Sequence, residues 1–117
     1  MKIKTSELTG HALNWAVSQV EGIDHDTAIL NITIGDDNGW FLDYLTWAQG
    51  GPIIEREKIK VDYRDTFDWW VAYINGGTDD EYGCASETPL TAAMRCYVGY
   101  KLGDEVEIPQ ELLGELK

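Results

Sequence analysis

The stretch TWAQGGPIIERE, residues 46–57, decides how the middle of the chain is interpreted. Gly50 and Gly51 lack a Cβ atom, so the backbone can bend sharply there or lie against a bulky group. Pro52 follows with the fixed φ angle that suits the first position of a turn or of a short helix. We interpret this part as a turn between two strands, with the indole of Trp47 as one wall of a binding pocket beside it.

Strand patterns lie on both sides of this turn. Residues 27–34 are β-branched and alternate between apolar and polar, which predicts a strand, and residues 40–45 are expected to return as its hairpin partner. Residues 56–64 alternate between basic and apolar side chains, which predicts an extended segment. Residues 67–74 fit a helix or a strand, and their aromatic and β-branched content favours the strand. The acidic residues 78–87 are predicted to form the longest loop.

Two helices have clear start and stop signals. Thr9 can cap a helix whose apolar stripe runs from residue 10 to about residue 21. The pair Thr88-Pro89 supplies a capping hydroxyl and a proline at the first helical position, and a second stripe runs from there to Gly103. We therefore predict one domain over residues 1–117 with an α+β fold, in which an antiparallel sheet of about four or five strands carries two main helices on one face.

The composition is strongly acidic, because 21 acidic residues against 9 basic ones give a formal net charge of -12. Such a charge repels phosphates at long range, so we expect no direct nucleic-acid partner. The sequence contains neither an apolar run long enough to span a bilayer nor a signal sequence, so we expect a cytoplasmic protein without membrane contact. Cys84 and Cys96 are interpreted as free thiols, and neither a metal site nor a cofactor is expected.

Aromatic and arginine side chains suggest ligand binding. An exposed indole, Trp47 or Trp69, is expected to stack on a base. A phosphate would then pair with Arg56, Arg95 or Lys60. The candidate ligand-binding residues are Trp47, Gln49, Gly50, Gly51, Glu55, Arg56, Trp69 and Arg95.

Each of these features also has a structural interpretation. Adjacent tryptophans on a strand point to opposite faces, so one of Trp69 and Trp70 joins the core while the other stands free or covers another subunit. Arg95 is alternatively an exposed arginine on a helix, and Glu55 is more simply the partner of Arg56 in an ion pair. The row of bases within residues 56–64 also fits the solvated face of an amphipathic strand.

Several motifs, taken together, suggest a family. They are KTSELTG at residues 4–10, WAQGGPIIERE at 47–57, TPL at 88–90, AAMRCYV at 92–98 and KLGDEV at 101–106. With these motifs the chain resembles the NinX-like family, small proteins of unknown function encoded among the accessory genes of lambdoid phages and prophages. The resemblance implies a cytoplasmic protein made during infection, and it brings no catalytic residues to transfer.

Two functional hypotheses remain open. The first is a non-enzymatic binding protein that sequesters a small anionic, nucleotide-like ligand during infection, with a role in countering host defence. The alternative is an acidic inhibitor or nucleic-acid mimic that binds a host protein, which the charge of -12 favours. An enzyme is not expected, because no nucleophile, phosphate loop or metal motif accompanies Glu55, the one candidate base. The many aromatic residues also predict a homo-oligomer.

Overall fold

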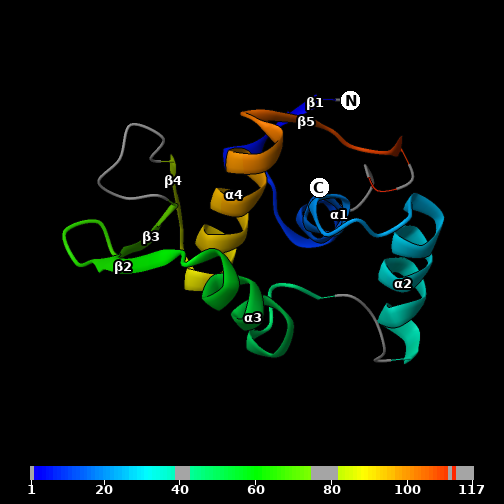
Figure 1. Ribbon diagram of the computed structural model, residues 1–117, viewed down its shortest axis with the longest axis horizontal. Coiled ribbons are helices and arrows are strands. Elements are labelled where there is room, and N and C mark those ends of the chain that lie inside the picture. Colours follow the sequence, from blue (N-terminus) through cyan, green and yellow to red (C-terminus); the bar gives the residue numbers. More distant parts are fainter. Residues whose placement is uncertain (1, 39–42, 75–81, 111, 113–117) are drawn as a thin grey trace.

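The computed structural model describes residues 2–38, 43–74, 82–110 and 112. In chain order the elements are β1 (Lys2–Lys4), the 3-10 helix η1 (Thr5–Glu7), α1 (Gly10–Val20), α2 (His25–Asn38), α3 (Trp47–Glu57), β2 (Lys60–Arg64), β3 (Trp69–Ile74), β4 (Tyr82–Ser86), α4 (Pro89–Leu102) and β5 (Glu105–Glu107). After a short first strand, helices come first along the chain, and strands β2 to β4 follow them before the last long helix (Figure 1). Mixed helices and antiparallel strands confirm the predicted α+β class.

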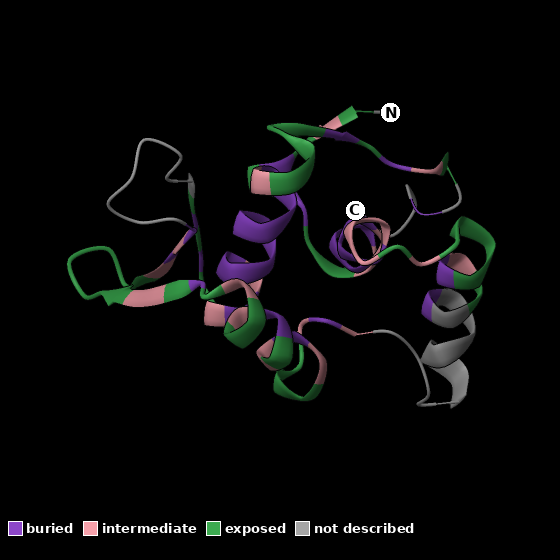
Figure 2. Cartoon of the chain, in the orientation of Figure 1, coloured by how far each residue is buried: buried purple, intermediate pink, exposed green. Residues whose placement is uncertain are grey.

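Helix α4 forms the centre of the molecule. It begins as predicted, with the Thr88 side chain accepting a hydrogen bond from the backbone N–H of Thr91 at 3.3 Å and with Pro89 at the first position. Residues 92–99 are all buried, and Figure 2 shows the buried colour along most of the helix. A helix that is buried on all sides must be covered by several elements. The three-stranded sheet, α1 and α3 all contact it.

The strands divide between two sheets, so the prediction of a single sheet was wrong in this respect. One sheet has the order β2-β3-β4, with antiparallel neighbours, and α4 contacts all three of its strands. The other pairs β1 with β5, joining Ile3 to Val106 near the two ends of the described chain. The expected pair of helices on one sheet face is also wrong, because α1 packs on α4 and α2.

Helix α2 occupies the segment 27–34 that was predicted to be a strand. The side chain of Asp24 accepts a hydrogen bond from the backbone N–H of Thr27 at 3.1 Å, which is the capping signal that the strand interpretation overlooked. Ala28 and Ile32, four residues apart, are fully buried, whereas Leu30 between them is 54% exposed. The apolar alternation therefore concealed a helical spacing.

The strand predicted for residues 40–45, as the hairpin partner of residues 27–34, is absent from the part of it that the structure describes. Residues 40–42 of the expected strand 40–45 lie outside the described residues, and Tyr44 and Leu45 lie in a turn. A similar correction applies further on, where β4 occupies part of the expected loop 78–87 and residues 75–81 are not described. Strand β4 pairs with β3, which was predicted correctly as a strand.

Helix α3 replaces the turn predicted for residues 47–52. Pro52 lies inside the helix, where it removes one backbone hydrogen bond, and Lys58 ends the helix with a left-handed φ of 55°. The extended segment expected from residue 56 therefore begins only at Lys60, with β2. Helix α3 meets α4 at two points: Glu57 pairs with Lys101 at 3.9 Å, and the backbone at Gly50 lies so close to Leu90 that a Cβ atom there would clash with it.

Candidate functional site

The predicted site residues separate into two places on the molecule. Four of them line an open groove of about 550 Å³ on α3, which we call the α3 groove: its lining is Trp47, Gly51, Pro52, Glu55 and Arg56. Two more of them, Trp69 and Arg95, form part of a smaller pocket of about 270 Å³ at the start of α4, the α4 pocket: its lining is Thr9, Trp69, Ser86, Glu87, Thr88, Thr91 and Arg95. The eight candidates therefore do not form one site.

Two of the candidates serve the packing of α3. The side-chain oxygen of Gln49 accepts a hydrogen bond from the backbone N–H of Asp43 at 3.2 Å. Gly50 is buried where α3 passes the backbone of Tyr44 and the side chain of Leu90. The glycine is required by a neighbouring backbone within the protein, so its presence needs no ligand to explain it.

Arg95 is the central residue of the α4 pocket. It is only 8% exposed, so the alternative of an exposed helical arginine was wrong. Its Nε donates to the carbonyl of Leu8 at 2.7 Å and its Nη1 to the carbonyl of Ala85 at 3.0 Å. No ion pair joins it to a carboxylate within the described ranges. Burial lowers the pKa of Arg95, and the negative fields of Cys84 and Glu7 offset this only in part.

The walls of the α4 pocket combine an indole with hydroxyls at a helix start. Trp69 stands at the beginning of β3 and is 40% exposed. The hydroxyls of Thr88 and Thr91 are hydrogen-bonded to each other at 2.8 Å over the first turn of α4. The N-terminal end of a helix of this length carries a partial positive charge, which adds to that of Arg95. Glu87 is the acidic member of the lining.

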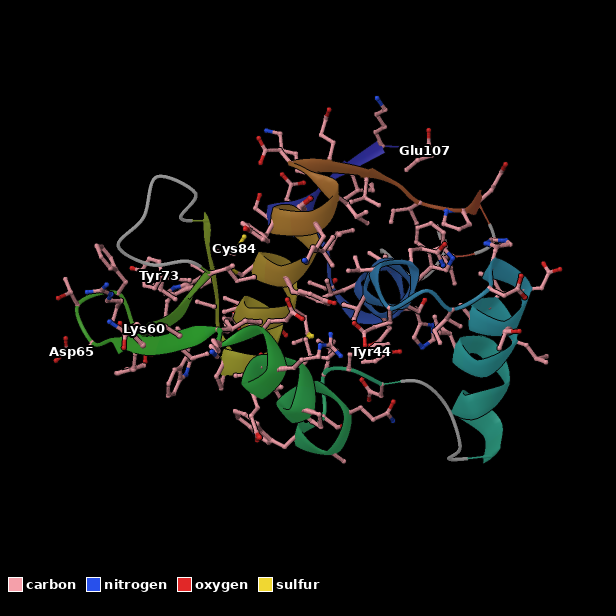
Figure 3. All side chains as sticks on the ribbon, viewed as in Figure 1. Tyr44, Lys60, Asp65, Tyr73, Cys84 and Glu107 are labelled. Carbon is pink, nitrogen blue, oxygen red and sulfur yellow. The ribbon has the colours of Figure 1, made fainter. Side chains whose placement is uncertain are left out.

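The sequence predicted Trp69 and Arg95 as ligand-binding residues, but it did not predict that role for the polar residues around them. Thr88 was recognised as a helix cap, and the same signal could have suggested an anion site, since a capped helix start presents N–H groups and a positive dipole end. Ser86 and Glu87 were assigned to a loop, which hid their place beside the pocket. Figure 3 shows their neighbour Cys84 where β4 approaches α4.

Arg56 in the α3 groove is held by other parts of the protein. Its Nη1 and Nη2 donate to the two carboxylate oxygens of Glu21 at 3.1 and 2.7 Å, and its Nε donates to Glu57 at 2.8 Å. Its Nη2 also donates to the hydroxyl of Tyr97 at 2.9 Å, and that hydroxyl donates to Glu21 at 2.5 Å. The predicted pairing of Arg56 with Glu55 was wrong. This cluster joins the end of α1 to α3 and α4.

The cluster makes folding stability depend on pH. Partial burial acts to raise the pKa of Glu21, but hydrogen bonds from Arg56 and Tyr97 outweigh it and lower the pKa below its usual value. A carboxylate whose pKa is lower in the folded state stabilises the fold above the unfolded-state pKa and loses that contribution as the pH falls through the folded-state value.

We expect Glu21→Gln to lower the free energy of unfolding by about 1 kcal/mol at neutral pH, a modest value because solvent screens the half-exposed Arg56. The difference between variant and wild type should shrink as the pH falls below the usual glutamate pKa of 4.5. Urea denaturation at several pH values measures this. Glu105→Gln, at an exposed position on β5, is the control, and an equal loss in both variants would contradict the assignment.

The family model described as Bacteriophage P22, NinX matches residues 4–101. The chain belongs to the NinX family. The matched range confirms the resemblance expected from the motifs, and it includes every residue that lines the α4 pocket and the α3 groove. A search among curated proteins found no match. Membership of the NinX family identifies the chain as a phage accessory protein of unknown function. It assigns no chemical role to the residues of the α4 pocket or of the α3 groove.

The described residues of this NinX-family chain were also compared with the requirements of a membrane-spanning helix and of a metal site. None of the helices in these ranges combines the length and the apolar character needed to cross a bilayer. In the same ranges, no group of three or more His, Cys, Asp or Glu side chains is arranged to hold a metal ion.

Proposed function

We propose that this phage accessory protein acts without catalysis, by sequestering a small anionic, nucleotide-like ligand in the α4 pocket, in the host cytoplasm and against a host defence signal. The observation that carries the proposal is the guanidinium of Arg95, which is buried without an ion pair in the described residues. A buried charge without a counter-ion costs free energy, and an anion bound beside it would remove much of that cost.

The local charge supports an anion in spite of the acidic composition. The net charge of -12 repels anions at long range. At physiological ionic strength, however, exposed charges are screened beyond about 8 Å, so groups lining the pocket dominate once a ligand arrives. Arg95 and the start of α4 both favour negative charge there. Carboxylates elsewhere on the surface then mainly slow the approach of the ligand.

The remaining lining favours a nucleotide over a bare phosphate. The exposed indole of Trp69 offers a face for stacking on a planar ring. Glu87 can accept hydrogen bonds from a ribose hydroxyl or an exocyclic amine, a contact that a bare phosphate cannot make. The volume of about 270 Å³ suits a small ligand, with room for one nucleotide at most. Among the described residues, neither His nor Cys lines the pocket, which supports binding without chemistry.

Native mass spectrometry of the protein purified from infected or defence-expressing cells tests the proposal first. A small molecule present in the native spectrum and released on denaturation is the expected result, at one molecule per pocket. In parallel, AMP, GMP, CMP and UMP are titrated into the ligand-free protein by calorimetry. A clean ligand-free spectrum together with no heat from any nucleotide would overturn the proposal.

Trp69→Ala is expected to weaken nucleotide binding about tenfold, since stacking of a base on an aromatic side chain contributes about 1–3 kcal/mol. The indole is partly exposed at the end of a strand, so the variant should still fold. Inorganic phosphate should bind both proteins equally, because it does not stack. A variant that binds nucleotides as tightly as the wild type would exclude Trp69 from the site.

A further inference from the structure

The outer face of α3 offers a second surface, apart from the α4 pocket. Trp47 is 60% exposed there and Pro52 is also exposed, so apolar surface faces solvent along the helix. A Cβ atom on Gly51 would have the Trp47 ring as its nearest neighbour, at 3.8 Å, so the glycine leaves open space beside the indole. The result is a groove of about 550 Å³ in which one side of a ring is accessible.

The free charge in this groove is negative. Arg56 lines it, but the guanidinium is already paired with the carboxylates of Glu21 and Glu57. Glu55 is exposed, and its carboxylate makes neither a hydrogen bond nor an ion pair with the described residues. An indole with an unpaired carboxylate on the same helix face attracts a cation, through the ring quadrupole and through charge.

The spacing of these two groups determines what kind of cation fits. Trp47 and Glu55 are eight residues apart on α3, which corresponds to a rise of about 12 Å. A small free cation cannot reach both groups. A peptide segment that carries an arginine can: the aliphatic stem of the arginine lies over Pro52 and Gly51, its guanidinium meets the carboxylate of Glu55, and the adjoining residue of the segment covers the indole.

We propose that the α3 groove is the docking surface for an arginine-bearing segment of a partner protein. The net charge of -12 complements a basic partner and would speed the encounter. The arginines of a second copy of this chain are poor candidates: Arg56 is ion-paired, Arg64 donates to the hydroxyl of Tyr73 at 2.7 Å, and Arg95 is buried. The proposal does not depend on the ligand of the α4 pocket.

The test uses the full chain and the peptide Ac-Gly-Arg-Leu-Arg-Gly-amide as the probe. Proton–nitrogen NMR follows the indole N–H signals, and Trp47→Phe identifies the signal of Trp47. We expect this signal to shift with the arginine peptide but with neither the matched glutamine peptide nor free arginine amide. Failure of the Trp47 signal to move, or an equal shift with the glutamine peptide or with arginine amide, would overturn the proposal.

Two variants that remove the same charge distinguish binding in the α3 groove from nonspecific attraction of the peptide to an acidic protein. Glu55→Gln is expected to weaken the peptide about tenfold, whereas Glu105→Gln, which removes the same charge from exposed β5, should change the affinity less than twofold. Equal weakening in both variants would show attraction to net charge and would reject the groove. Sedimentation completes the test, since a dimer that disappears in Trp47→Ser would identify a second copy as the occupant and overturn the proposal.

Discussion

Gly50→Ala is expected to lower the free energy of unfolding by roughly 3 kcal/mol or more, the largest single effect that we expect in this protein. The new Cβ atom would lie 2.2 Å from the carbonyl oxygen of Tyr44 and 2.7 Å from Leu90 Cδ2. A side-chain tip can move aside, but the Tyr44 carbonyl belongs to the backbone that leads into α3. Helix α3 and the backbone at Tyr44 would therefore have to move apart.

The neighbouring glycine supplies the control for this prediction. A Cβ atom on Gly51 would make only an ordinary contact with Trp47 Cε3 at 3.8 Å. Alanine also favours a helix over glycine by about 1 kcal/mol, so Gly51→Ala should leave stability unchanged or raise it slightly. Urea denaturation of the two variants measures the difference. Equal effects at both positions would contradict the close packing described for Gly50.

Arg95→Met is expected to weaken nucleotide binding about 100-fold or more, because a buried charge-assisted hydrogen bond to phosphate contributes about 3 kcal/mol. The stability of the ligand-free protein should change far less, by about 1 kcal/mol. The carbonyls of Leu8 and Ala85 lose their donor, but the protein no longer buries an unpaired charge. Calorimetry with the four mononucleotides and urea denaturation measure the two effects separately.

Arg95→Lys extends this test. Lysine keeps the positive charge but has no planar fork of donors, so it cannot hold both backbone carbonyls and a phosphate in the arrangement that arginine allows. We expect intermediate binding, about tenfold weaker than wild type. If the methionine variant fails to fold, the lysine variant can still show whether Arg95 takes part in ligand binding. Undiminished binding in either variant would remove Arg95 from the proposed site.

The two proposed sites assign separate roles to residues that the sequence had grouped together. The α4 pocket has a buried positive charge and an indole, and the α3 groove has a free carboxylate and another indole. Local charge therefore separates an anionic ligand from a cationic partner segment, although both sites lie on the same acidic chain. Variants of Trp69 and of Glu55 can test the two independently.

Some elements were predictable from the sequence because local signals and tertiary packing agree. Thr88, Pro89 and the apolar stripe that follows give α4 a cap and a sufficient length, and the structure buries that stripe apart from Leu102, which is 44% exposed. The aromatic run that becomes β3 was likewise predicted as a strand. In both elements the intrinsic preference of the residues and the final contacts favour the same conformation, so no distant contact was needed to decide it.

The sequence by itself therefore determined the α+β class, the family, α1, α4 and β3, because capping residues and apolar spacing act over a few neighbouring positions. Tertiary packing was needed to decide α2, where the cap at Asp24 was the one local helix signal, and α3. The β-branched residues of α2 favour a strand locally, yet burial of Ala28 and Ile32 selects the helix. The glycines and Pro52 of α3 favour a turn locally, yet packing against α4 supports a helix there. The separation of Arg56 from Arg95 follows from those same long-range contacts.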